Sequence, residues 1–132
     1  MDVELRNAAQ SSGESDIYLA EAGIDGDPDT FSMTNNRGAH WWRASMDLVI
    51  VHELSLRAFS EGDHGIKVSL YKNGSTVGEC GMHPGTGVFF DMGCDKVPAD
   101  MVMLLLKDSQ MTVYELTVKG IMVPLGNSLL II

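Results

Sequence analysis

Short segments in which apolar and polar residues alternate constrain the fold of this 132-residue chain more than any other feature. Segments 50–57 (IVHELSLR) and 66–71 (IKVSLY) both alternate, and the first places His52 on the apolar face. The Asn-Gly pair in the turn 72–75 that follows favours a tight hairpin. Further apolar runs, separated by turns rich in Gly, Pro and Asp, occupy 88–92, 101–106 and 111–118. Many short strands predict an all-β, single-domain β-sandwich or jelly roll.

The length fits one domain, and we expect residues 1–132 to form it, since single domains most often run about 100–150 residues. No internal repeat or domain boundary is visible, and only 17–23 (IYLAEAG) has the composition of a helical turn. The apolar tail 121–132 (IMVPLGNSLLII) is predicted to be a last strand that pairs near the termini. The alternative is a linker or a contact with a partner.

The charge balance excludes some partners. Nine basic residues against eighteen acidic ones give a net charge of −9, whereas phosphate backbones and anionic membranes need basic patches. We therefore expect no nucleic acid partner. We also expect no membrane insertion, because no apolar stretch approaches the roughly 20 residues of a membrane span. The start, MDVELRN, lacks the apolar region of a signal peptide, so we expect a removed leader or a domain of a longer protein.

No catalytic constellation is present. The four histidines are scattered, and His52 is predicted to be a core residue with its polar atoms satisfied. The G-x-S-x-G and H-E-x-x-H motifs and a glycine-rich phosphate loop are all missing. We therefore predict a binding module and not an enzyme.

Cys80 and Cys94 lie fourteen residues apart and flank an obvious turn, GMHPGTG. This spacing suits a disulfide across a hairpin better than a metal site, which needs further ligands at short spacing. Two buried free thiols are the alternative. The sequon Asn73-Gly74-Ser75 in a turn agrees with an extracellular protein, either secreted or on the cell surface.

The loop 22–34 (AGIDGDPDTFSMT) is rich in oxygen ligands. Asp25, Asp27 and Asp29 stand at alternate positions, and hydroxyl side chains follow them. Calcium takes six to eight oxygens, including backbone carbonyls, so this loop is a candidate calcium site. The spacing does not match an EF-hand. The alternative is a solvated loop whose aspartates cap turns.

The pair Trp41-Trp42 follows a polar loop and has two interpretations. Adjacent strand residues face opposite sides, so one ring would seal the core and the other would cover an edge. The second interpretation is a stacking surface for a sugar, since aromatic rings present large apolar faces.

Several segments, taken in order, make the chain resemble the F-type (fucose-binding) lectin domain, a β-jelly roll related to discoidin domains. The resemblance covers roughly residues 5–120. The matching segments are NAAQSS (7–12), AGIDGD (22–27), SMTNN (32–36), HWWR (40–43), the Cys80 and Cys94 pair, and VYELTVKG (113–120).

The resemblance implies a structural calcium ion that ties the first loop to the last strand. Family half-cystines are replaced by Met33 and Tyr114, while the Cys80–Cys94 bridge resembles one that the family keeps. The implied ligands are the Asp25 and Glu115 carboxylates, the hydroxyl and carbonyl of Ser32, and the carbonyls near Ala22, Asp27 and Tyr114.

The resemblance also implies a fucose site, in which family members use a His and two Arg over a pair of adjacent cysteines. Asn35 stands at the position of the His, and Arg57 matches the first Arg. Segment 58–67 lacks adjacent cysteines, and His64 is its candidate for the second basic group. Phe31 is the candidate contact for the methyl group of the sugar.

These expectations describe a calcium-stabilised lectin module for fucosylated or related glycans. Lectins with weak single sites gain strength in a homo-oligomer or a multidomain array. The alternative is an adhesion or recognition domain of the same fold that has lost sugar binding and binds a protein. A third possibility is an accessory domain of a carbohydrate-active enzyme.

Overall fold

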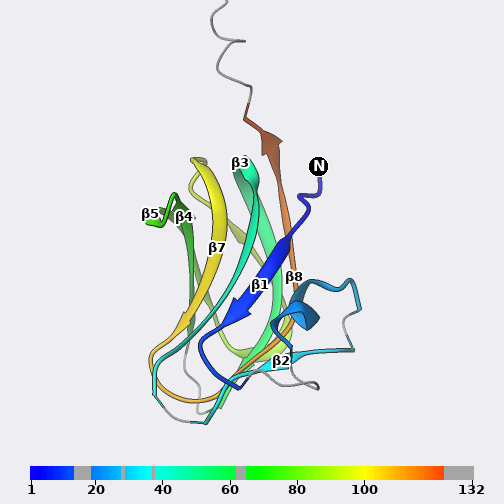
Figure 1. Cartoon of the computed structure of the whole chain (residues 1–132), viewed down its shortest axis with the longest axis vertical. Helices are drawn as coiled ribbons and strands as arrows, with labels where there is room; N and C mark the ends of the chain where they lie inside the picture. The colour runs from blue at the N-terminus through cyan, green and yellow to red at the C-terminus, as the bar shows by residue number, and fades with distance from the viewer. Residues whose placement is uncertain (14–18, 28, 37, 62–64, 124–132) are drawn as a thin grey trace, which may run out of the picture.

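A computed structural model describes residues 1–13, 19–27, 29–36, 38–61 and 65–123. In these ranges β-strands dominate, as the alternating segments predict, and a short 3₁₀ helix, η1, is the other regular element (Figure 1). The elements are β1 (Arg6–Gln10), η1 (Ala20–Ile24), β2 (Ser32–Met33), β3 (His40–Ser60), β4 (Ile66–Lys72), β5 (Ser75–His83), β6 (Thr86–Gly93), β7 (Pro98–Leu106) and β8 (Met111–Met122).

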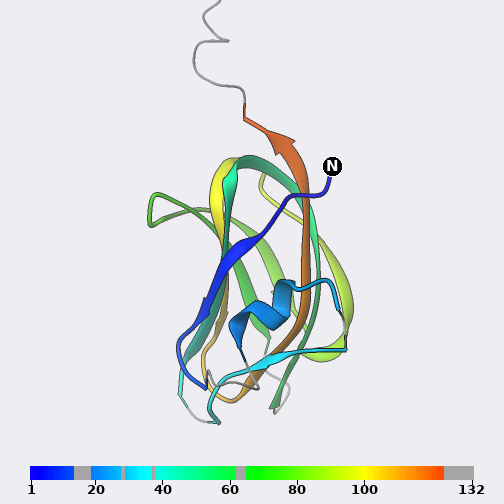
Figure 2. The same ribbon diagram turned by 45° about the vertical axis from the view of Figure 1, so that its right-hand side comes forward.

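The long strand β3 organises the fold. Its first half pairs with β1 and β7, and its second half pairs with β6 and β8, all antiparallel. The register breaks between Ser45 and Val49, where β3 arches over from one layer into the other (Figure 2). One layer therefore runs β1-β3-β7-β4-β5, and the facing layer runs β2-β8-β3-β6. The predicted all-β sandwich is confirmed.

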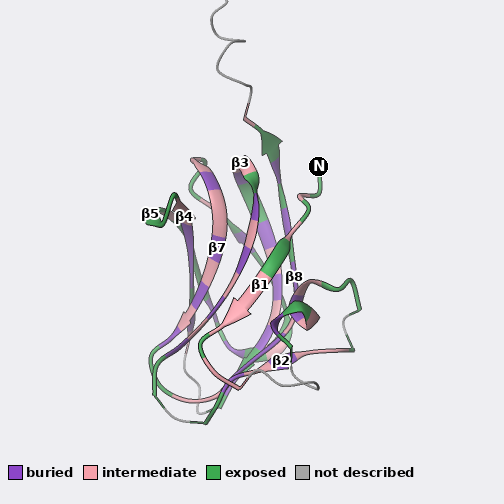
Figure 3. Ribbon diagram, viewed as in Figure 1, coloured by how far each residue is buried: buried purple, intermediate pink, exposed green. Residues whose placement is uncertain are grey.

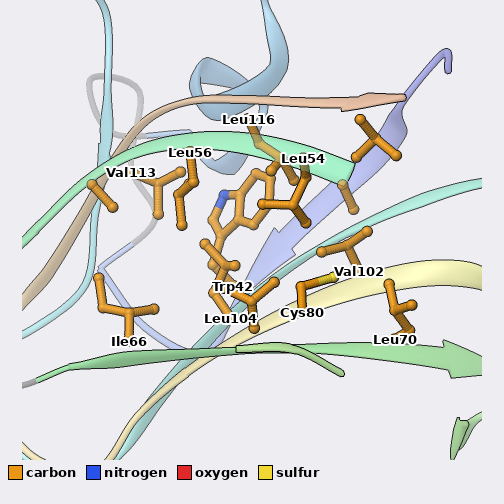
Figure 4. Packing of buried hydrophobic residues seen from close by; sticks show 14 of the residues in the cluster. Trp42, Leu54, Leu56, Ile66, Leu70, Cys80, Val102, Leu104, Val113 and Leu116 are labelled. Carbon is orange, nitrogen blue, oxygen red and sulfur yellow. The ribbon is translucent and has the colours of Figure 1, made fainter. Parts of the chain in front are cut away.

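The core lies between the two layers. Buried positions alternate with partly exposed ones along β7, as Figure 3 shows, because successive side chains of a strand point to opposite faces. Figure 4 shows Trp42 between side chains of the two layers, among them Leu56 and Val113 of one layer and Leu104 and Ile66 of the other. Trp42 is fully buried, whereas Trp41 points to the opposite face and is partly exposed.

The prediction for His52 is wrong. A bulge in β3 between Val51 and Glu53 shifts the pairing with β8 by one residue. The inward face therefore continues from Val51 to Leu54, and His52 is exposed to solvent. An extra residue at a bulge reverses which face the following side chains occupy, and a strict period of two cannot anticipate it.

The two ends of the sandwich differ. At one end the N-terminal residues run beside β8, where Val3 N donates to Val118 O and Gly120 N donates to Met1 O. Strand β8 extends to Met122, so the first two residues of the predicted tail strand are confirmed, and residues 124–132 lie outside the described ranges. Residues 34–36, Glu61 and residues 107–110 lie together at the opposite end, called the loop end below (Figure 1).

Cys80 and Cys94 form the predicted disulfide, which joins β5 to the residue after β6. His83, the last residue of β5, is fully buried, and its ring makes three hydrogen bonds. Its Nδ1 accepts from Gly85 N at 2.8 Å, and its Nε2 lies 2.9 Å from Leu56 O and 3.1 Å from Val88 O. Together these links hold the β5–β6 hairpin against β3.

Candidate functional site

The oxygen-rich loop is fixed to the sandwich through η1. The indole Nε1 of Trp42 donates to Ala20 O at 3.0 Å, inside the core. Gly23 packs directly on the Trp42 ring and on Val113, where a Cβ atom would lie only 2.8 and 2.9 Å from their side chains. This close approach requires glycine, so the sequence Ala-Gly at 22–23 determines how the loop docks.

Three oxygens of this loop converge on the hydroxyl of Thr30. Its Oγ1 lies 2.5 Å from Asp25 Oδ2, 2.9 Å from Asp27 O and 3.5 Å from Ala22 O. A hydroxyl has one hydrogen, so it can fully satisfy only one of these acceptors at a time. The arrangement therefore concentrates oxygen lone pairs and negative charge at one point.

Two further candidate ligands have buried oxygens without a partner. Ser32, in β2, pairs with Val113 of β8, and Glu115 lies two residues further along β8. The Ser32 side chain is 1% exposed and that of Glu115 is 7% exposed. Ser32 Oγ and Glu115 Oε1 have no hydrogen-bond partner among the described residues. Buried polar atoms nearly always have a partner, and a bound ion is one reason for an exception.

The electrostatics around Glu115 favour a cation. Burial first, and then the nearby Asp25 and Asp27 carboxylates, raise the pKa of Glu115 to about 7, against the lowering effect of a hydrogen bond from Gly26 N–H. The negative charges of the two aspartates, which penalise the charge of Glu115, would favour a positive ion placed between these carboxylates.

The donor set fits calcium. Carboxylate, hydroxyl and carbonyl oxygens from Ala22, Asp25, Asp27, Ser32 and Glu115 are hard ligands of the type that Ca²⁺ takes. In the described ranges, no group of three or more His, Cys, Asp or Glu side chains is arranged to hold a metal by itself, so main-chain and hydroxyl oxygens would have to complete the shell.

The alternative interpretation of the aspartates is visible as well. Asp27 N donates to Asp25 Oδ1 at 2.9 Å and Asp29 N donates to Asp27 Oδ1 at 3.0 Å, and both contacts are side-chain turns of the Asx type. Each aspartate uses one oxygen for its turn, which leaves the other oxygen for a second role.

Phe31 and Arg57 both contact the ring of Tyr114. The Phe31 and Tyr114 rings are 5.5 Å apart between centroids, and the Arg57 guanidinium lies 4.4 Å from the Tyr114 centroid. Arg57 Nε also donates to Gly87 O at 3.0 Å. The structure thus brings two predicted sugar contacts together around a residue that was predicted only as a carbonyl ligand.

Asn35 lies elsewhere, at the loop end. It lines a polar cavity of about 390 Å³ together with Gly13, Thr34, Asn36 and Gln110. The residue before Asn35, Thr34, lies beside Met111 of β8, since Thr34 N donates to Met111 O. Arg57 lies beside Glu115, four residues further along the same strand. At about 3.3 Å per strand residue, the backbone positions of Thr34 and Arg57 are therefore separated by roughly 13 Å along β8. His64, the third predicted polar contact, lies outside the described residues.

Sequence reasoning gave no role to one residue of these sites and missed another. Thr30 was noted only as one of the hydroxyl residues of the oxygen-rich loop, and it is the hydroxyl on which the loop oxygens converge. Gln110 donates from Nε2 to Thr34 O at 3.1 Å and so joins the β7–β8 loop to the Asn35 loop. No local pattern marks Gln110, because its role depends on tertiary proximity.

The fold is shared with fucose-binding lectin domains and with CBM32 modules. The lectin domain of lectinolysin, solved in complex with Lewis B antigen, is 19% identical with a TM-score of 0.74, over 87% of this chain and 92% of that one. A Streptococcus pneumoniae fucose-binding module is 14% identical with a TM-score of 0.77, over 91% and 95%. The CBM32 module CpGH89CBM32-5 from Clostridium perfringens, in complex with GalNAc-β-1,3-galactose, is 13% identical with a TM-score of 0.77, over 91% and 100%.

No protein-family model matches the sequence, and no curated protein matches it closely. The resemblance to F-type lectins is supported by the similarity of the three-dimensional structures. In the part of the chain that the structure describes, no helix is long and apolar enough to cross a membrane.

Proposed function

We propose that this chain is a non-catalytic glycan-binding module. The observation that carries the proposal is the fold, which is shared over most of its length with a lectin domain bound to Lewis B antigen, a fucose-binding module and a module bound to GalNAc-β-1,3-galactose. A fold alone does not determine function, so the site must also be suited to the ligand. The polar cavity at the loop end meets this requirement, because amide groups offer both donors and acceptors to sugar hydroxyls.

In this proposal Ca²⁺ stabilises the module without touching the sugar. The ion would be held by Asp25, Ser32 and Glu115 with the carbonyls of Ala22, Asp27 and Tyr114, and it would join the η1 loop to β2 and β8. Support comes from the three acceptors around Thr30 and from the unpaired oxygens of Ser32 and Glu115.

The Asn35 cavity is the sugar site that we favour. Gln110, which lines it, is bound to the loop that contains Thr34 and Asn35, and Glu61 N donates to Gln110 O, so three segments meet there. Fucose or a fucosylated glycan is the proposed ligand, as the sequence resemblance implies. Arg57 would contribute to this site only through a glycan long enough to reach from Asn35 to the Tyr114 ring.

A glycan array tests the proposal. The protein is screened once with millimolar calcium and once with EDTA, beside the Asn35→Ala and Gln110→Ala variants. We expect binding to fucosylated glycans that requires calcium and is lost in both variants. Binding that both variants retain would place the site elsewhere, and an array without any signal from folded protein would reject the proposal.

A protein-binding role is the second candidate, and one surface favours it. Val88, Phe89 and Phe90 of β6, together with Phe59 of β3, are between 39% and 57% exposed. Exposed apolar clusters of this kind often mark interaction surfaces. This role predicts a blank glycan array from a protein that calcium still protects against heat.

We also propose an extracellular location. The Cys80–Cys94 disulfide is of the kind that persists in oxidising compartments, and Asn73 of the sequon is exposed in the β4–β5 turn. Expression in a secretory host should yield protein with an N-glycan at Asn73, which mass spectrometry would detect. An unmodified Asn73 in protein secreted from that host would argue against a role for the sequon.

A further inference from the structure

A groove crosses the outer face of the β1-β3-β7-β4-β5 layer, apart from both sites described above. It has a volume of about 810 Å³, within the range of small-molecule sites, and shares no residue with the Asn35 cavity. Its floor is one row of paired residues from four neighbouring strands. The row runs from Trp41 through Leu105 and Lys67 to Met82.

Trp41 is held in place beside this groove. The Arg43 guanidinium lies 4.9 Å from the centroid of the Trp41 ring and covers one face of it. Trp41 lines the groove, so a ligand in the groove would meet the part of its ring that Arg43 leaves uncovered. A fixed, partly exposed indole gives an apolar surface that needs little ordering when a ring stacks on it.

The charge of the groove is opposite to that of the chain. Its lining contains Lys67 and Lys107 against the single acid Glu79, although the whole chain carries −9. Lys67 Nζ lies 3.3 Å from Glu79 Oε1, whereas the exposed Lys107 makes no salt bridge within the described ranges. One lysine is therefore available to an anion from outside, and a second can change partner.

His40 lines the groove, but its side chain faces the core. It pairs with the buried Leu106 and lies on the same face of β3 as Trp42, whereas Trp41 faces outward. Its Nδ1 lies 3.3 Å from Ser11 Oγ and 2.9 Å from Ser12 Oγ, and its Nε2 has no partner among the described residues. The ring is therefore not a contact for a ligand on the outer face.

We propose that this groove is a second ligand site and that it binds an acidic saccharide of the uronate type. A pyranose ring stacks on the face of Trp41 that Arg43 does not cover, and its carboxylate pairs with Lys107 and, after exchange from Glu79, with Lys67. This site goes beyond the proposed glycan site at the loop end and does not depend on it.

The test uses the galacturonic acid tetramer as the probe and its methyl ester, which has the same backbone without charge, as the matched control. Binding is followed in ¹⁵N-labelled protein by NMR and by calorimetry, at low and at high salt and with EDTA. We expect the tetramer to shift the Trp41 indole and the Lys67 and Lys107 amides. The methyl ester should bind about tenfold more weakly or worse, and salt should weaken the tetramer.

Three variants complete the test. Trp41→Ala and Lys107→Gln should each reduce affinity for the tetramer by about tenfold or more, while Asn35→Ala leaves it unchanged. Lys107 is exposed, so its variant should fold even if Trp41→Ala is destabilised. The proposal is overturned if the ester binds as tightly as the acid, if Lys107→Gln binds normally, or if the shifts fall only at the loop end. Failure of the loop-end site would instead be seen on the glycan array, as binding by Asn35→Ala equal to that of the wild type.

Discussion

The imidazole of His83 lies 2.9 Å from the carbonyl oxygen of Leu56, across the interior from strand β5 to strand β3. Because Nδ1 accepts from Gly85 N, the ring proton is on Nε2 and is donated to Leu56 O and Val88 O. A neutral ring satisfies every one of these bonds, whereas a second proton would displace the Gly85 bond and place a charge in the core. Burial accordingly lowers the pKa of His83 below its ordinary value of 6.5.

The first prediction is therefore a loss of stability in mild acid. The unfolded chain binds a proton at this residue near pH 6.5, while the folded protein resists it. The contribution of His83 is thus fully present above pH 6.5 and decreases as the pH falls towards the lowered folded pKa. Urea unfolding at pH 7.5 and 5.5 measures the effect. His83→Gln, compared with the wild type at both pH values, should show a smaller decrease, and an equal decrease would refute the role of His83.

The second prediction concerns Glu115. Without calcium, its buried carboxylate is penalised by burial and by Asp25 and Asp27, so Glu115→Gln should be at least as heat-stable as the wild type in EDTA at pH 8. With millimolar calcium the order should reverse, because the variant has lost a charged ligand. Thermal melts with and without calcium give both comparisons. A variant that calcium stabilises as much as the wild type would remove Glu115 from the calcium shell.

The third prediction separates two roles of Arg57. Its bond to Gly87 O and its contact with Tyr114 are structural, so Arg57→Ala should lose about 1–2 kcal/mol of stability as well as any sugar contact. Arg57→Lys keeps the charge, so it should lose less stability than Arg57→Ala, and its melting temperature should fall by only about 4 °C. Glycan binding that survives in both folded variants would mean that Arg57 serves only the fold.

The fourth prediction is that the disulfide stabilises the β5–β6 region. Cys80 and Cys94 are fourteen residues apart, and closing a loop of that length stabilises by about 3 kcal/mol in the chain-entropy model. Denaturant unfolding of the Cys80→Ala/Cys94→Ala double variant should show this loss, and the oxidised wild type treated with a reductant should approach it. A double variant as stable as the oxidised protein would contradict the estimate.

The alternation of side chains was enough to predict the strands and the sandwich, because a buried face imposes a period of two wherever the pairing is regular. It failed at His52, since a bulge is set by the partner strand and not by the local sequence. It also gave no sign that His83 is a core residue, because the three groups that satisfy its ring lie in two other strands and in a turn.

The candidate sites were predicted unevenly for a similar reason. Candidate calcium ligands could be named because most of them lie in one continuous loop, and the resemblance supplied Glu115. The groove on the outer face could not be predicted, because its floor joins Trp41, Leu105, Lys67 and Met82 only after four strands have paired. The sequence did identify Trp41 and Trp42 as a pair with two possible roles, and the structure assigns one ring to the core and the other to the surface.

The path of β3 has a consequence for synthesis on the ribosome. The first half of β3 can pair with β7, and its second half with β8, only after those later strands have been translated. Val3, near the N-terminus, also forms a backbone hydrogen bond with Val118 of β8. A nascent chain that ends before residue 111 therefore exposes the apolar inner face of half the sandwich. Such long-range pairing slows folding and leaves unfinished edges open to other chains. Of the described strands, β8 is translated last and completes the sandwich, so a chaperone that shields β3 until then would have most effect on yield.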